Sequence, residues 1–185
     1  MIKELMKDTE SRMTKTQEAL ATDLKSVRTG RASPAILDRV LVDYYGVPTG
    51  LNKLAVVSAP EPQLLVVRPF DPTSISAIER AIMTADLGLN PGNDGRIVRI
   101  PIPRLTEERR RALVKVVKRR VEEAKISLRN IRRDTLDDLR DFENEKLISE
   151  DDKKRGQDEL QKLTDRYVKV VDEIGERKEQ EIMAI

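Results

Sequence analysis

The sequence of 185 residues predicts an α+β protein in which a small β/α domain is inserted into a three-helix bundle. Three observations carry this prediction. Apolar residues recur at spacings of three and four near both ends of the chain, which is typical of bundle helices. Between them the pattern changes to strand-like alternation. The composition is rich in Ala, Glu, Lys, Leu and Arg, which indicates long helices.

The first predicted helix runs from Ile2 to about Thr29. Its apolar positions recur every seven residues, with further positions between them at spacings of three or four: Met6, Met13, Leu20 and Val27, then Ile2, Thr9, Thr16 and Leu24. This is the pattern of a bundle or coiled-coil helix. The two threonines weaken the stripe, so the helix needs partners. We expect it to stop at Gly30.

Residues 31–104 are predicted to form the inserted domain. Alternating side chains indicate strands at about 40–45, 64–67 and 97–100, and a short apolar run lies at 54–57. We interpret residues 46–50 as a turn, Pro60 and Pro62 as breaks, and residues 86–95 as a loop. A helix begins after Asp71-Pro72-Thr73-Ser74 and continues to about Asp86.

Two long helices are predicted for the rest of the chain. One runs from Leu105 to about Lys146, and the other begins at Ser149 as N-cap, with Asp152 three residues on. Isolated helices are marginal in water, so residues 1–30 and 105–185 should pack as one bundle. The chain then crosses between the domains twice, near 30–34 and 101–104, and these crossings predict a hinge. Its residues are Gly30, Arg31, Pro34, Pro101 and Pro103.

The composition excludes many enzymes, because the chain has no Cys and no His. That removes thiol nucleophiles, cysteine or imidazole metal sites and His-based acid–base catalysis. Gly88, Gly92 and Gly95 lack the Gly-Lys-Ser/Thr of a phosphate loop. The acidic run at 150–152 could hold Mg²⁺, but a helix N-terminus favours acids in any case. We find no nucleophile–base pair and expect no metal and no cofactor, and a Mg²⁺-dependent enzyme that uses this acidic run stays the alternative.

The chain is also expected to be soluble and unexported. No apolar run approaches the roughly 20 residues that span a bilayer. The first ten residues carry charges where a signal peptide would be apolar.

A net charge of +2 conceals a strong asymmetry. Residues 104–133 hold 12 basic and 4 acidic residues, whereas residues 134–185 hold 10 basic and 17 acidic. Four cations lie seven apart, on one stripe of the second helix: Arg111, Lys118, Lys125 and Arg132. Such an edge suits either an RNA backbone or pairing with the acidic last helix, and both readings stay open for Lys118 and Lys125. The arginines at 129, 132 and 133 favour bidentate contacts with phosphate.

Several motifs then carry a family resemblance over essentially the whole chain. They are VRTGRASP (27–34), DYYGVPT (43–49), AIMTADLGLNPGNDG (81–95), PRLTEERRR (103–111), LRNIRRD (128–134), LISEDD (147–152) and QDELQKLTDRYV (157–168). With these motifs the sequence resembles the bacterial ribosome recycling factor family.

The resemblance implies an L-shaped molecule with dimensions like those of a transfer RNA. It implies a non-enzymatic cytoplasmic factor, which we expect to be a monomer, that acts with elongation factor G and GTP. Together they split the post-termination 70S ribosome into subunits and release messenger and deacylated transfer RNA. The bundle would bind large-subunit ribosomal RNA (rRNA) through Arg28, Arg31, Arg110, Arg129, Arg132 and Arg133, with Lys118 on the same edge.

Overall fold

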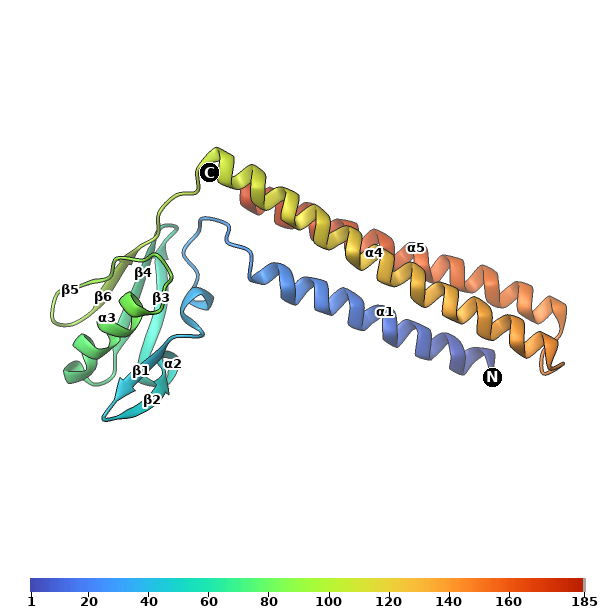
Figure 1. The fold of residues 1–185 in the computed structure, drawn as a ribbon, viewed down its shortest axis with the longest axis horizontal. Coiled ribbons are helices and arrows are strands. Elements are labelled where there is room, and N and C mark those ends of the chain that lie inside the picture. The colour runs from blue at the N-terminus through green and yellow to red at the C-terminus, as the bar shows by residue number, and fades with distance from the viewer. Residues whose placement is uncertain (185) are drawn as a thin grey trace. The chain divides into compact units, whose positions relative to one another are not determined.

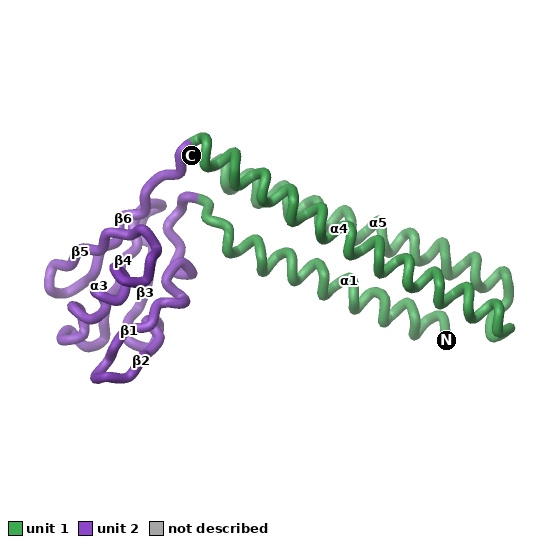
Figure 2. Tube along the Cα trace, in the orientation of Figure 1, with its two compact units in different colours: residues 1–29, 107–185 green, residues 30–106 purple. Residues whose placement is uncertain are grey.

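The chain folds into two units in a computed structural model that describes residues 1–184. Unit 1 comprises residues 1–29 and 107–185, and unit 2 comprises residues 30–106 (Figure 2). Unit 1 is a helix bundle and unit 2 a small β/α domain, so the predicted fold class is confirmed. Within residues 1–184, no helix combines the length and the apolar character needed to cross a bilayer.

Within the described residues, unit 1 consists of three long helices that lie side by side (Figure 1). They are α1 (Ile2–Lys25), α4 (Glu107–Asn144) and α5 (Glu150–Met183). Each buries a stripe with the predicted spacing of three and four, and in α4 it comprises Leu113, Val117, Val121, Ala124, Leu128, Ile131, Thr135 and Leu139. Burial of these stripes holds the bundle together, because it removes apolar surface from water.

Thr9 of α1 is built into the bundle core. Thr9 and Thr135 are both buried, and their hydroxyl oxygens lie 2.7 Å apart. Thr135 also donates to the Ile131 carbonyl at 3.1 Å. A buried hydroxyl without a partner is costly, so this pair favours one register of α1 against α4.

Two helix ends test the sequence signals. The predicted start of α5 is confirmed, because the Asp152 backbone N–H donates to the Ser149 side chain and the Asp152 carboxylate accepts the Ser149 N–H. The predicted end of α1 was wrong: the helix ends at Lys25, not near Thr29. The Ser26 hydroxyl donates to the Asp23 carbonyl at 2.6 Å and so takes up a carbonyl of the last turn.

A glycine in α5 allows a close approach to α4. Gly175 is buried, and a Cβ at this position would lie 2.5 Å from the Val121 Cγ2. The absence of a side chain there brings the two backbones together.

Among residues 30–106, unit 2 contains a hairpin, a four-stranded antiparallel sheet and one longer helix. The hairpin pairs β1 (Leu41–Tyr44) with β2 (Val47–Gly50). The sheet has the order β3-β4-β6-β5, from β3 (Ala55–Glu61), β4 (Leu64–Pro69), β6 (Val98–Pro101) and β5 (Gly92–Asn93). The helices are α3 (Ile75–Thr84), the single turn α2 (Leu51–Leu54) and two 3₁₀ turns at Pro34–Leu37 and Pro72–Ser74. One apolar cluster joins them, with Leu65, Val67, Ile78, Val98 and Ile100 near its centre.

Three local interpretations of unit 2 were wrong. Residues 46–50 are not all turn: Tyr45 and Gly46 both have positive φ and reverse the chain, so the next four residues pair as β2. Pro60 does not break the chain, because β3 is an edge strand whose pairing is irregular between Ser58 and Glu61. The expected loop at 86–95 contains the short strand β5.

Candidate nucleic-acid interface

The basic stretch of the sequence forms the first two thirds of α4 and the residues before it. Because α4 and α5 are antiparallel, its neighbours are the last residues of α5. Lys125 bonds to Asp172 at 2.5 Å, and Arg110 Nη1 lies 3.4 Å from the Met183 carbonyl. Residues 160–185 hold 5 basic and 6 acidic residues, so they offset little of this charge.

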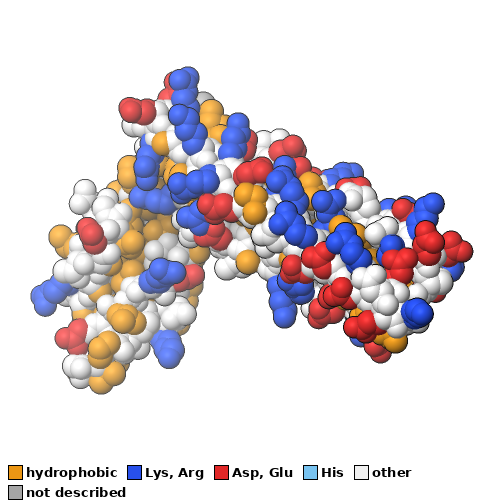
Figure 3. Space-filling model, turned by 45° about the vertical axis from the view of Figure 1, so that its right-hand side comes forward, with side chains coloured by type: hydrophobic (Ala, Val, Ile, Leu, Met, Phe, Trp, Pro, Cys, Tyr) orange, Lys and Arg blue, Asp and Glu red, His pale blue; other side chains and the backbone are white. Residues whose placement is uncertain are grey.

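The acidic surplus lies at the opposite end of the bundle. Residues 134–159, around the α4–α5 turn, hold 5 basic and 11 acidic residues. In Figure 3, basic side chains gather where α4 begins, and acidic ones gather at the end with this turn. The last helix is the neighbour of the basic stretch, but antiparallel packing places most of its acidic surplus at the other end of the bundle, so it compensates less of the charge than expected.

The stripe of four cations lies along the groove between α4 and α5. Arg111, Lys118 and Lys125 line this groove together with Glu176 and Glu179. Lys125 is neutralised by Asp172, and Arg111 pairs with Glu107 within α4 at 2.5 Å. Lys118 is exposed and, within residues 1–184, forms no ion pair. Lys125 thus follows the alternative of pairing with the last helix, whereas Lys118 keeps its charge without an ion pair among residues 1–184.

The three arginines at 129, 132 and 133 keep their charge away from α5 carboxylates. Arg129 pairs with Glu122 of its own helix at 3.2 Å. Arg133 is exposed and forms no ion pair among residues 1–184. Arg132 is half-buried, and its Nη1 donates to the Gln161 Oε1 at 2.8 Å. Its Nε is buried without a hydrogen-bond partner among the described residues. We call the side chains of Lys118, Arg129, Arg132 and Arg133 the α4 edge.

The other candidate cations lie near the start of α4 and in the segment after α1. Arg110 is half-buried, and its Nε is also buried without a hydrogen-bond partner in the described chain. Arg28 and Arg31 are exposed and form no ion pair within residues 1–184. Among the hinge candidates, Gly30 has φ +79°, and a Cβ there would lie 3.2 Å from the Leu105 Cγ. Pro34 begins a 3₁₀ turn, Pro101 ends β6, and Pro103 lies between β6 and α4.

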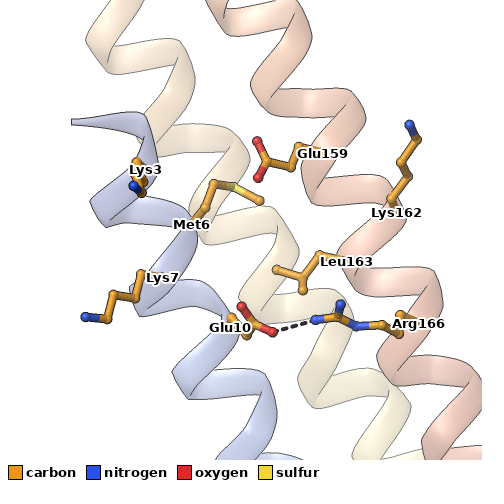
Figure 4. A pocket seen from close by; sticks show the side chains of 8 residues that line it. All are labelled: Lys3, Met6, Lys7, Glu10, Glu159, Lys162, Leu163 and Arg166. Carbon is orange, nitrogen blue, oxygen red and sulfur yellow. Dashed lines mark hydrogen bonds and ion pairs between the residues drawn. The ribbon is translucent and has the colours of Figure 1, made fainter.

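A second cation-lined groove lies between α1 and α5, with a volume of about 530 Å³ (Figure 4). Met6 and Leu163 form its apolar wall. Its cations are Lys3, Lys7, Lys162 and Arg166, and its acids are Glu10 and Glu159. Arg166 is bound by Glu10 at 2.5 Å and lies over the Tyr167 ring at 5.4 Å. The arginine of this groove is therefore already paired.

Comparison with known proteins decides the family. The family model described as "Ribosome recycling factor" matches residues 20–183. The chain belongs to the ribosome recycling factor family. The ribosome-recycling factor of Syntrophomonas wolfei is 56% identical over 185 residues and that of Halalkalibacterium halodurans is 55% identical, each with full coverage of both chains. The resemblance predicted from the motifs is confirmed.

Solved structures agree with this assignment. A solution structure of the ribosome recycling factor has a TM-score of 0.77 at 38% identity and covers 100% of this chain and 98% of its own. A second match is described as models for the T. thermophilus ribosome recycling factor and the E. coli elongation factor G bound to the E. coli post-termination complex. It has a TM-score of 0.64 at 47% identity, with full coverage of both chains.

Sequence reasoning missed two residues beside the arginines of this recycling factor. Gln161 accepts from Arg132, and its Nε2 donates to the Asp165 Oδ1 at 2.8 Å. Both lie on α5, four residues apart. Their spacing is visible in the sequence, but nothing in it says that they face Arg132, because that needs the register of α5 against α4.

The acidic run at 150–152 serves the helix end. Hydrogen bonding to the side chain and backbone of Ser149 lowers the pKa of Asp152, and Arg155 binds the same carboxylate at 2.7 Å. No cluster of three potential metal ligands occurs among residues 1–184. The glycine loop is likewise a turn: the Asp94 carboxylate accepts the N–H groups of Arg96 and Ile97, both at 2.9 Å, which lowers the pKa of Asp94.

Proposed function

We propose that this chain splits the post-termination ribosome into its subunits together with elongation factor G and GTP, releasing messenger RNA and deacylated transfer RNA. Membership of the family supports recycling as the function, and with it a translation factor that is not an enzyme. The solved relative with elongation factor G on a post-termination complex supports the two partners. GTP hydrolysis then belongs to elongation factor G, and we infer from the ribosomal partner that the chain acts in the cytoplasm.

The proposed rRNA-binding surface is the α4 edge, extended by Arg110, Arg28 and Arg31. The observation that carries it is the charge of residues 104–133, which the neighbouring part of α5 leaves largely uncompensated. Arginine forks match phosphate oxygens, and each phosphate contact releases condensed counterions. The described residues of this edge include no aromatic ring for base stacking. We therefore expect readout of backbone and shape, not of base sequence.

The proposed mechanism needs a stiff body and a movable one. Helix α4 has 38 residues, which corresponds to about 57 Å at 1.5 Å per residue. Such a rod transmits displacement from one end to the other while its edge stays on rRNA. The two connecting segments, near residues 30–34 and 101–104, are proposed as the hinge that lets unit 2 respond to elongation factor G.

A binding and splitting assay with the full chain tests this proposal. The isolated chain should bind purified large subunits, and it should split post-termination ribosomes only with elongation factor G and GTP. Replacing both Arg129 and Arg133 by Glu should weaken binding by at least about 100-fold, because two charge-assisted contacts are lost at about 1.5–3 kcal/mol each. Full-strength binding by this double variant, at unchanged thermal stability, would refute the α4 edge as the surface.

A further inference from the structure

We propose that Gln161 is a positioning residue for Arg132: its side-chain amide, fixed by Asp165, holds the guanidinium ready for an rRNA phosphate without neutralising it. This inference rests on the proposed function and adds residues of α5 to the surface on α4. It concerns the orientation of the Arg132 guanidinium and not the presence of its charge.

The two hydrogen bonds define the orientation of the amide. A glutamine side chain has one oxygen that accepts and one nitrogen that donates. The Asp165 carboxylate can only accept, so the Gln161 Nε2 points to it at 2.8 Å. The Oε1 is then left to accept from Arg132 Nη1, also at 2.8 Å. A residue one turn further along α5 thus fixes which end of the amide Arg132 meets.

The position of the guanidinium is fixed from its other side as well. The Arg132 Nε is buried and, within residues 1–184, has no hydrogen-bond partner. The side chain is therefore packed at its stem and anchored at one Nη. The remaining N–H groups make no hydrogen bond within the described chain. An arginine held this way loses less rotamer freedom when a phosphate binds.

The choice of a neutral partner sets Arg132 apart. Five basic side chains that reach a neighbouring helix end on a carboxylate, namely Arg12 on Asp134, Arg120 on Asp23, Lys125 on Asp172, Lys153 on Glu143 and Arg166 on Glu10. Arg132 ends on an amide, and Arg110 on the Met183 carbonyl. A carboxylate would compete with phosphate for the guanidinium, whereas an amide oxygen orients it and leaves the positive charge in place.

Substitutions at Gln161 separate orientation from charge. Gln161→Glu should weaken binding to purified large subunits about tenfold and lower the slope of log affinity against log salt by about one, since the new carboxylate pairs with Arg132. Gln161→Ala should weaken binding only about threefold and leave the slope unchanged, since Arg132 stays charged but is no longer held. Gln157→Glu, one helical turn earlier on α5, is the matched control for added charge, with an expected loss of about twofold.

The same substitutions in an Arg132→Ala background complete the test. There Gln161→Glu should cost no more than Gln157→Glu, because the residue it acts through is gone. Equal losses from Gln161→Glu with and without Arg132, or equal losses at 161 and 157 in the natural background, would overturn the positioning role. If Arg132→Ala itself binds like the natural chain, the rRNA surface fails instead. Thermal unfolding of each variant confirms that the bundle is intact.

Discussion

Arg166 and Arg132 lie at the contacts of α5 with α1 and α4, and they differ in whether a carboxylate neutralises their charge. Arg166, in the groove between α1 and α5, is bound by the Glu10 carboxylate and lies over the Tyr167 ring. Arg132 of α4 donates to the amide of Gln161 on α5 and, among residues 1–184, forms no ion pair. The sequence contains the same residue type in both places. The first is paired with a carboxylate of the bundle, and the second is left available to an outside anion.

Charge reversal at these two positions should give the largest difference. Arg132→Glu is expected to weaken large-subunit binding by roughly 100-fold, because a charge-assisted contact is lost and a repulsion is added. Arg166→Glu should change binding by less than about threefold, because that charge is already used inside the bundle. Equilibrium binding to purified subunits at moderate salt measures both. Similar losses at the two positions would break the comparison.

A cross-link between the connecting segments tests whether binding by the α4 edge is separate from splitting. The chain has no cysteine of its own, and a Cβ at Gly30 would lie 3.6 Å from the Leu105 backbone nitrogen. A Gly30→Cys, Leu105→Cys variant brings two thiols to this close approach, at the cost of a strained Cys at φ +79°, and formation of the single disulfide is checked by thiol titration. Oxidation should leave large-subunit binding unchanged but slow splitting by about fivefold or more, and reductant should restore it. The reduced protein is its own control, and equal splitting rates in both forms would show that the hinge is not needed.

A smaller effect, on stability, is expected at Gly175. A substitution there loosens the packing of α5 on α4, the helix that carries Arg132. Gly175→Ala places a Cβ against Val121, whose β-branched side chain is stiff. The clash should cost about 1–3 kcal/mol, partly offset by about 1 kcal/mol of helix propensity. The free energy of unfolding should fall by about 1 kcal/mol. Gly156→Ala is the control, since its Cβ would meet the Leu139 Cδ2 at 3.1 Å and should be close to neutral.

The smallest effect concerns Asp152, whose carboxylate stabilises the first turn of α5. The pKa of Asp152 is lowered in the folded state by Ser149, so its contribution to stability is present above the ordinary pKa of about 3.8 and is lost as pH falls through the folded value. Asp152→Ala should destabilise the chain at pH 7, and the difference from the natural chain should narrow as pH falls below 3.8 and through the lowered folded pKa of Asp152. Denaturant unfolding across this pH range measures it. A stability difference that does not depend on pH would show that the Asp152 charge does not contribute to stability. Large-subunit binding by Asp152→Ala should be unchanged.

What the sequence could predict depends on how local each signal is. The start of α5 needs only Ser149 and Asp152, so it was predicted to the residue. The end of α1 was missed because the helix ends at Lys25, with Ser26 as its C-cap, before it reaches Gly30. Serine is a weaker signal for a helix end than glycine. Strand β2 was missed because Pro48 and Gly50 are common in turns, and only the pairing with β1 identifies it.

The site shows the same limit. The basic stretch was visible in the sequence, but the compensation by α5 was overestimated because the acidic charge was averaged over residues 134–185. Antiparallel packing places that charge mostly at 134–159, away from Arg110 and Lys118. Gln161 has no distinctive chemistry of its own, and only the register that brings it to Arg132 gives it a role.

The salt dependence of large-subunit binding tests the central claim most directly, when it is measured for the natural chain, Arg132→Glu and Arg166→Glu. Counterion release predicts a steep fall of log affinity with log salt for the natural chain, a slope smaller by at least about one for Arg132→Glu, and a line parallel to the natural chain for Arg166→Glu. A flat titration of the natural chain, or one slope shared by all three, would contradict the account.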